Sequence, residues 1–367
     1  MTLYAVLGAT GAVGKTCALR LASHAAETGD RVRLGGRDRH RLEALAADLP
    51  GNVEVLPTDL SDDASLAAFC ADAHVVASCA GPSYALLDRV ARAAWAADAD
   101  LVDIGGELAA VHRLGGRAGA PAPQLDRRTA VFSAGVMPGL SGLLPRLLCR
   151  EAPPRRLDSF VGGAQIFTSL SAVDGLLTRG EEFGTPSAIA SHGDVIAGRL
   201  SPLHNVSLPG FPMPVHAWPY LTTEAQELSR AEEIAEVRAY NVFVTNRLPE
   251  AMAAAWAELG EEAAVDEVRR AADAVVRAAD ADREDHGQFY VMLFTARPTP
   301  GGPSGPSRLV LTATDSYAVS GVVMAEAARQ VADGLPAGAW LAARILDPDR
   351  MLQALRSDPH IDSVDIG

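Results

Sequence analysis

Residues 8–14 read GATGAVG, and they directly follow the short apolar run LYAVL of residues 3–7. The apolar run predicts a strand, and Lys15–Glu27 has the periodicity of a helix. Glycine at position 8 permits a tight turn, glycine at 11 lets the backbone approach a pyrophosphate, and glycine at 14 lets the helix pack close to the sheet. Free N–H groups at the helix start would face the anion. The unit predicts a dinucleotide site formed by Gly8, Thr10, Gly11, Ala12, Val13 and Gly14.

The remainder of the first 140 residues alternates strand-like and helix-like patterns. Such alternation implies crossover connections and a parallel sheet. We therefore expect an α/β fold, a Rossmann-type doubly wound parallel sheet with six strands. A rival interpretation is a P-loop, because residues 12–16 read AVGKT, but that motif requires glycine where the chain has Ala9. The further strands are expected at 31–35, 52–56, 74–79, 101–104 and 130–134, with helices at 39–48, 62–71 and 84–97.

The end of the second predicted strand indicates which dinucleotide binds. Sites for NAD place an acid there for the ribose, whereas sites for NADP use arginine. Here residues 34–37 read LGGR, and the Arg37 guanidinium could grip a 2′-phosphate with two hydrogen bonds. Asp38 weakens this argument unless it caps the next helix, and Arg41 is expected on a solvated helix face. NADP(H) is the favoured cofactor.

Other cofactor contacts are expected at the carboxyl ends of the strands, where this fold binds its ligands. Asp59 and Leu60 would lie at the adenine, although Asp59 could equally be a turn or capping residue. The segment Cys79, Ala80 and Gly81 would run along the nicotinamide-side ribose. The remaining expected contacts are Asp103, Gly135, Val136 and Met137.

Composition narrows the class of protein. The formal net charge of −14 disfavours nucleic acid and anionic membranes as partners, since both are polyanions. The four cysteines form no C-x-x-C pair and no histidines stand at zinc-ligand spacing, so we expect reduced thiols and no metal. The chain enters a strand at once, and residues 134–148 are too short and too broken by Pro and Gly to span a bilayer. A soluble, cytoplasmic protein acting on a small molecule is expected.

Alternation stops after residue 140, which predicts a second domain. Strands are expected at Ser159–Phe167 and Ala239–Thr245, separated by a turn-rich stretch over 180–219, and a helical stretch covers 249–283. Two β-rich runs at 288–296 and 308–314 predict a hairpin, and a last helix is expected at 318–332. The predicted division is a dinucleotide-binding domain of 1–140 plus 316–367 and an inserted α+β substrate and dimerisation domain of 141–315.

Several stretches resemble the saccharopine dehydrogenase/reductase-like family of NAD(P)-binding oxidoreductases. They are GATGAVG (8–14), GGR (35–37), SCAGP (78–82), LVDIGGE (101–107), AGVMPGLSG (134–142) and the C-terminal runs 315–338 and 345–352. The resemblance implies a Rossmann domain with an inserted domain that carries the substrate pocket and commonly the dimer contact, and hence a homodimer. It also implies hydride transfer at a carbon–nitrogen bond, although relatives reduce other double bonds, including conjugated C=C bonds. The insert has few arginines, which favours a less anionic substrate.

These arguments predict an NADPH-dependent reductase of a C=N bond in a small metabolite. Glu107 follows a strand end and two glycines, so its carboxylate could stabilise an iminium. Tyr84 follows the fourth strand, and Tyr220 lies in a proline-restrained aromatic loop suited to a pocket wall. The alternatives are an enoyl or carbonyl reductase on the same scaffold, or a non-catalytic NADP(H)-binding regulator.

Overall fold

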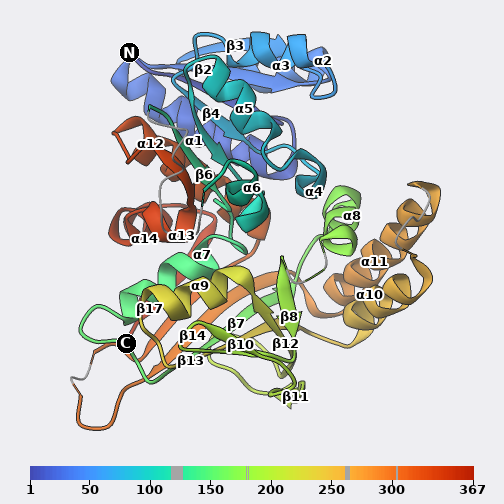
Figure 1. Cartoon of the computed structure of the whole chain (residues 1–367). Helices are drawn as coiled ribbons and strands as arrows, with labels where there is room; N and C mark the ends of the chain where they lie inside the picture. The colour runs from blue at the N-terminus through green and yellow to red at the C-terminus, as the bar shows by residue number, and fades with distance from the viewer. Residues whose placement is uncertain (117–126, 179, 181, 261–264, 303–304) are drawn as a thin grey trace. The chain divides into compact units, whose positions relative to one another are not determined.

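The structure is a computed structural model that describes residues 1–116, 127–178, 180, 182–260, 265–302 and 305–367 (Figure 1). Its internal contacts divide the chain into two compact units, Met1–Leu143 with Tyr317–Asp358 and Leu144–Ser316 with Pro359–Gly367. The predicted division placed residues 359–367 in the first domain. They belong to the second unit instead, because strand β17 (Ile361–Ile366) forms backbone hydrogen bonds with β15 (Arg308–Ala313).

The first unit contains a parallel sheet of seven strands in the order β16-β6-β5-β4-β1-β2-β3. The chain moves outward from β1 in both directions, so the sheet is doubly wound and the expected Rossmann-type fold is confirmed. The seventh strand was not predicted: β16 near the C-terminus pairs with β6 at the sheet edge. The strands are β1 (Leu3–Leu7), β2 (Arg31–Gly36), β3 (Asn52–Pro57), β4 (Val75–Ser78), β5 (Asp100–Asp103), β6 (Thr129–Phe132) and β16 (Gly338–Leu341).

Helices cover both faces of this sheet. Apolar side chains of α3, α5 and α6 pack with residues of β1, β4, β5 and β6 in one core cluster. The predicted helix over 84–97 is two helices, because Leu87 between them has a φ of 41°. The helices are α1 (Ala12–Thr28), α2 (Arg39–Ala47), α3 (Asp63–Cys70), α4 (Ser83–Leu86), α5 (Arg89–Ala96), α6 (Glu107–Arg113), α7 (Leu140–Leu143), α12 (Ser316–Ala332), α13 (Ala342–Ile345) and α14 (Pro348–Arg356).

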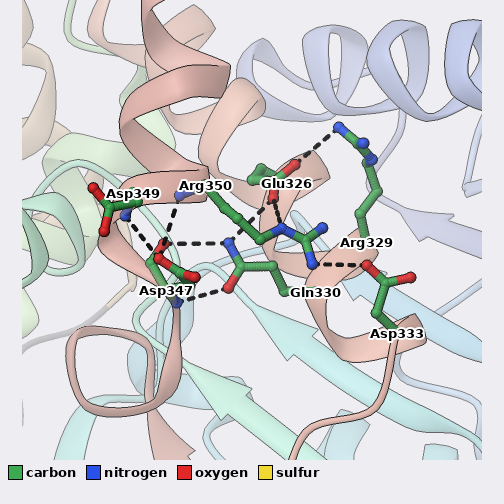
Figure 2. Close-up of polar contacts among 7 residues, drawn as sticks. All are labelled: Glu326, Arg329, Gln330, Asp333, Asp347, Asp349 and Arg350. Atoms are coloured by element: carbon green, nitrogen blue, oxygen red, sulfur yellow. Dashed lines mark hydrogen bonds and ion pairs between the residues drawn. The ribbon is translucent and has the colours of Figure 1, made fainter.

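Helix α12 lies directly against α1. A Cβ atom at Gly321 would come within 2.5 Å of the Thr16 Cβ, so glycine there allows the two backbones to approach closely. At its other end α12 holds α14 through the buried carboxylate of Glu326, which accepts hydrogen bonds from Arg329 (2.9 Å), Gln330 (3.1 Å) and Arg350 (3.1 Å) (Figure 2). Residues 317–358 are therefore an integral part of the first unit.

The second unit is built on a mixed sheet with ten strands among the described residues. At its centre β7 runs parallel to β13 and antiparallel to β14. The predicted hairpin is confirmed, since β14 and β15 pair antiparallel. The strands not yet given are β7 (Arg156–Ala164), β8 (Gly184–Pro186), β9 (Ile189–Ser191), β10 (Asp194–Ile196), β11 (Leu203–Val206), β12 (Val215–Thr222), β13 (Glu236–Phe243) and β14 (Phe289–Arg297).

The stretch over 180–219 was predicted as turns, but it contributes short strands to this sheet. Tyr220 accordingly lies in strand β12 and not in a loop, because the alternating residues Val215, Ala217, Pro219 and Leu221 are buried. The unit also contains a short 3-10 helix (Leu144–Leu148) and helices α8 (Ser169–Leu177), α9 (Thr223–Ala231), α10 (Arg247–Glu258) and α11 (Val265–His286). Within the described part of the chain, no helix is both long and apolar enough to cross a membrane.

Candidate functional site

The turn between β1 and α1 requires glycine at two positions for reasons internal to the protein. Gly8 has a φ of 75°, and its N–H and that of Ala9 both donate to the Gly35 carbonyl at the end of β2 (2.9 and 3.1 Å). A Cβ at Gly14 would lie 2.1 Å from the Gly8 carbonyl oxygen, far inside van der Waals contact. The turn and the start of α1 are therefore locked to each other and to β2.

Gly11 is different, because the surrounding protein leaves space for a side chain there. Its φ of −76° is ordinary, and among the described residues a Cβ would meet only the Gly8 oxygen, at 3.1 Å. Gly11 is exposed and stands at the N-cap of α1, whose first N–H groups have no acceptor within the helix. The first turn carries no acidic residue, so the positive end of the helix dipole is not neutralised. An open cradle at an uncapped helix start fits a dinucleotide pyrophosphate.

The charged residues that follow β2 have different contacts. The Asp38 carboxylate caps α2 by accepting a hydrogen bond from the Arg41 N–H at 3.1 Å, as the capping interpretation requires. Arg37 is exposed. Arg39 forms an ion pair with Glu43 at 3.5 Å along the helix surface.

Arg41 departs from the expectation of a purely solvated position. Although exposed, its guanidinium donates a hydrogen bond of 3.3 Å to the carbonyl of Thr10 in the turn before α1. Arg41 lies in the first turn of α2, and helical side chains point back toward the N-terminus of their helix, here toward the end of β2. Two exposed arginines therefore follow the end of β2, and one of them contacts the turn before α1.

Asp59 is a turn residue, which was the alternative interpretation of this position. Its Oδ1 accepts hydrogen bonds from the Ser61 N–H (2.9 Å) and hydroxyl (2.7 Å). These two bonds, with a smaller contribution from the charge of Arg37, lower the pKa of the Asp59 carboxyl. Leu60 is half-buried and packs against the core cluster of the sheet. Asp59 nevertheless stays exposed beside Arg37 at the sheet end.

The segment after β4 lies against the first turn, and its predicted contact with the nicotinamide-side ribose stays a prediction. A Cβ at Gly8 would be 3.0 Å from both the Ala80 nitrogen and the Cys79 carbonyl carbon. The Cys79 thiol contacts the Cys17 thiol, and this contact together with burial raises the pKa of Cys79 well above its usual value. A thiol held protonated is no nucleophile. Residues 79 and 80 therefore lie beside Gly8 at the carboxyl edge of the sheet.

The end of β5 is organised by Asp103. Its buried carboxylate accepts a hydrogen bond from the Gly105 N–H at 2.9 Å, and its carbonyl accepts one from Ala134 at 3.0 Å. The following turn has positive φ at Gly106 (90°) and also at Glu107 (45°), where a side chain makes that conformation strained. Glu107 is half-buried as the first residue of α6. Such local strain concentrates at functional turns.

Tyr84 comes from a neighbouring segment of the same unit. It lies half-buried in α4, and a Cβ at Gly105 would be 2.4 Å from the Cβ of the preceding residue, Ser83. The turn that carries Glu107 therefore lies against the helix that carries Tyr84. Tyr220 belongs to the second unit, where its ring lies against Gly184.

The end of β6 carries Ser133, which its position after the sixth predicted strand had already made a candidate near the nicotinamide. Ser133 has a φ of 61°, is 1% exposed, and its hydroxyl has no hydrogen-bond partner among the described residues. After it, residues 135–137 form a tight loop in which the Gly135 N–H donates to Pro138 (3.1 Å) and the Leu140 N–H to Gly135 (2.9 Å). Met137 at its tip is 38% exposed. The loop stands where the fold places its cofactor contacts.

One solved structure matches the whole chain. The apo histidine-tagged saccharopine dehydrogenase (L-Glu forming) from Saccharomyces cerevisiae covers 100% of this chain and 100% of its own, with a TM-score of 0.65 and 14% identity. The chain has the saccharopine dehydrogenase fold. The resemblance noted in the motifs is thereby confirmed at the level of fold, over both units.

Two further solved structures match only part of the chain. A short-chain dehydrogenase from Sphingobium yanoikuyae in complex with NADPH matches 29% of this chain and 53% of its own, at 24% identity and a TM-score of 0.22. Serine dehydrogenase from Escherichia coli matches 28% and 62%, at 19% identity and a TM-score of 0.25. No protein-family model matches the sequence, and no curated protein matches it.

The residues at the carboxyl edge of the first sheet therefore offer two distinct environments. One is a cationic cradle of backbone N–H groups and arginines for a phosphorylated cofactor. The other is a turn with a half-buried carboxylate, Glu107, packed against the helix of Tyr84. No group of three or more potential metal ligands occurs in the described ranges. The arrangement suits a reaction in which a bound dinucleotide reacts and side chains orient and polarise the substrate.

Proposed function

We propose that this protein is an NADPH-dependent reductase of a C=N bond in a small metabolite, converting an imine or iminium to an amine. The observation that carries the proposal is the open, uncapped start of α1 beside Gly11, flanked by Arg37 and Arg41. Backbone N–H groups would hold the pyrophosphate, and the arginines would hold a 2′-phosphate.

The preference for NADPH over NADH rests on the hydrogen bonds that Asp38 and Asp59 accept from the protein itself. In NAD sites a carboxylate at this position accepts a hydrogen bond from the ribose 2′-hydroxyl. The Asp38 carboxylate is engaged in capping α2, and Asp59 is engaged with Ser61. The exposed guanidinium of Arg37 remains as the group for the ribose, and its charge favours a phosphate.

The choice of a C=N bond is supported by the fold and by Glu107. A solved structure that matches the whole chain is a saccharopine dehydrogenase, and the motif resemblance implies chemistry at a carbon–nitrogen bond. NADPH, when bound, supplies the hydride that reaches the imine carbon. The Glu107 carboxylate would stabilise the positive charge on the iminium nitrogen, more strongly in a dry cleft than in water. Tyr84, in the same unit as Glu107, is proposed to orient the substrate, and the few arginines of the second unit favour a substrate of low negative charge.

The cofactor half of the proposal is tested by titrating NADPH and NADH into Arg37→Ala. Loss of a charge-assisted interaction of about 1.5–3 kcal/mol predicts a roughly 10- to 150-fold weaker binding of NADPH. NADH binding should hardly change. Arg39→Ala is the matched control, because Arg39 is as exposed but is paired with Glu43. Equal losses for both cofactors would make Arg37 a structural residue.

The chemical half is tested with Glu107→Gln, which keeps the shape and removes the charge. We expect unchanged NADPH binding and a fall in imine turnover of roughly 100-fold or more. The substrates should be a cyclic imine, a conjugated enone and a ketone of similar size. Turnover of the enone or ketone alone would replace this proposal by the enoyl or carbonyl reductase. Tight NADPH binding without any turnover would favour a regulator.

A further inference from the structure

Two histidines of the second unit face each other across an antiparallel pair of strands. The Nδ1 atoms of His204 on β11 and His216 on β12 are 3.1 Å apart, and the two rings meet edge to face. The ring of Trp218 lies beside them, edge to face with His204 at 5.9 Å between centroids. The cofactor cradle lies in the other unit, so the motifs above give these histidines no role.

The backbone explains why both rings reach the same point. Leu203 pairs with Ala217 and Val206 with Val215, so two residues of β11 stand opposite His216 alone. This extra residue is a β-bulge, and Asn205 in it has a φ of 53°. Bulges re-aim side chains, and here the bulge sets His204 opposite His216. Along β12 the histidine and Trp218 alternate with Val215 and Ala217, which are buried in the core cluster of this unit.

The spacing of the two nitrogens suits chelation of one cation. With metal–nitrogen bonds of about 2.05 Å, two nitrogens 3.1 Å apart subtend an angle of about 98° at the metal. That angle lies between the values of square-planar and tetrahedral coordination. Without a metal, the contact is a hydrogen bond in which one ring nitrogen donates and the other accepts.

We propose that His204 and His216 form a two-histidine site for a late first-row divalent cation such as Cu²⁺ or Zn²⁺. Imidazole nitrogen is a preferred ligand of these ions, whereas Mg²⁺ and Ca²⁺ prefer oxygen. No third His, Cys, Asp or Glu completes a cluster within the described chain. Water or an external ligand therefore takes the remaining positions, and His204 is exposed to admit it. The bound cation joins β11 to β12.

The test uses tag-free protein, so that no added histidines compete for the metal. CuSO₄ and ZnCl₂ are titrated by calorimetry, and Cu²⁺ also by tryptophan fluorescence, because Trp218 lies beside the site. We expect one equivalent to bind wild-type protein and a rise in Tm with Zn²⁺. His204→Ala and His216→Ala each lose the second ligand of a chelate, so affinity should fall roughly tenfold or more and the Zn²⁺-dependent rise in Tm should vanish. MgCl₂ should give neither signal.

His286→Ala is the matched control, an exposed histidine at the end of α11 in the same unit, and should behave as wild type. Trp218→Phe should keep the calorimetric stoichiometry while losing part of the fluorescence quenching. If the alanine variants do not fold, His204→Asn and His216→Gln replace them. Unchanged affinity in both single variants, an equal loss in His286→Ala, or no binding to wild type would overturn the proposal.

Discussion

The two glycines at the start of α1 should separate stability from cofactor binding. Gly14→Ala places a Cβ 2.1 Å from the Gly8 carbonyl oxygen and 2.8 and 2.9 Å from further backbone atoms of Gly8 and Ala9. Relief to an ordinary contact of 3.4 Å needs a movement of about 1.3 Å (3.4 − 2.1) of backbone that is hydrogen-bonded to Gly35. Overpacking of this kind costs about 1–3 kcal/mol.

Gly11→Ala meets only the Gly8 oxygen, at 3.1 Å, and keeps an ordinary φ. Its cost is that of alanine at an N-cap, about 0.5–1 kcal/mol. At about 2–4 °C per kcal/mol for a unit of this size, Tm should fall by about 2–12 °C in Gly14→Ala and about 1–4 °C in Gly11→Ala. The bulkier Gly11→Val should abolish NADPH binding while the protein stays folded, because the side chain fills the space beside the helix start.

The assay combines urea or thermal unfolding of the ligand-free variants with titration of NADPH fluorescence. Gly14→Ala with wild-type stability would refute the packing argument. Gly11→Val that still binds NADPH with wild-type affinity would refute the assignment of the cradle, whatever its stability.

Two further predictions concern stability. Glu326→Ala should lower the free energy of unfolding by about 2–3 kcal/mol, since it leaves two arginines and Gln330 without their common buried acceptor, whereas Glu326→Gln should cost less; urea unfolding measures both. Burial, with the charge of Glu232, raises the pKa of the Cys149 thiol to about 12. The pKa of this thiol is therefore higher in the folded protein than in the unfolded chain. The contribution of the buried, protonated thiol to the free energy of unfolding is fully present below pH ~9 and is lost as pH rises toward 12. Cys149→Ser should therefore show a weaker loss of urea midpoint between pH 7.5 and 10, and an identical loss would contradict the assignment.

The dinucleotide-binding half could be predicted because its signals are local. A strand, a turn and a helix start are encoded by neighbouring residues, so GATGAVG and the alternation behind it specify the doubly wound sheet. The sequence also supported both interpretations of Asp38, as an acid that argues against NADP and as the cap of the next helix. The Asp38 carboxylate accepts a hydrogen bond from the Arg41 N–H, which favours the cap. The sequence shows where the glycines are but not why each is needed. A side chain at position 14 would collide with the Gly8 carbonyl oxygen, whereas the described protein leaves space for one at position 11.

Long-range pairing needed the tertiary structure. Strand β16 joins the first sheet and β17 the second, although the two are close together near the C-terminus. Hydrogen bonds between strands distant in sequence select these partners, and such partners leave little trace in local periodicity. Tyr220 was expected in a loop for the same reason. The prolines of 209–219 indicate turns, and only the pairing of β12 with β13 shows that Tyr220 lies in a strand.

Local sequence therefore determined the doubly wound class of the first sheet, the glycine-rich turn before the first helix and the motif resemblance to saccharopine dehydrogenase-like proteins. Tertiary structure alone decided that Arg41 returns to Thr10, that Glu107 is held at a positive φ, and that His204 meets His216 across a bulge. Each of these depends on where a side chain or a backbone turn lies in space. Periodicity fixes the face of a strand or helix, and only packing fixes what that face meets.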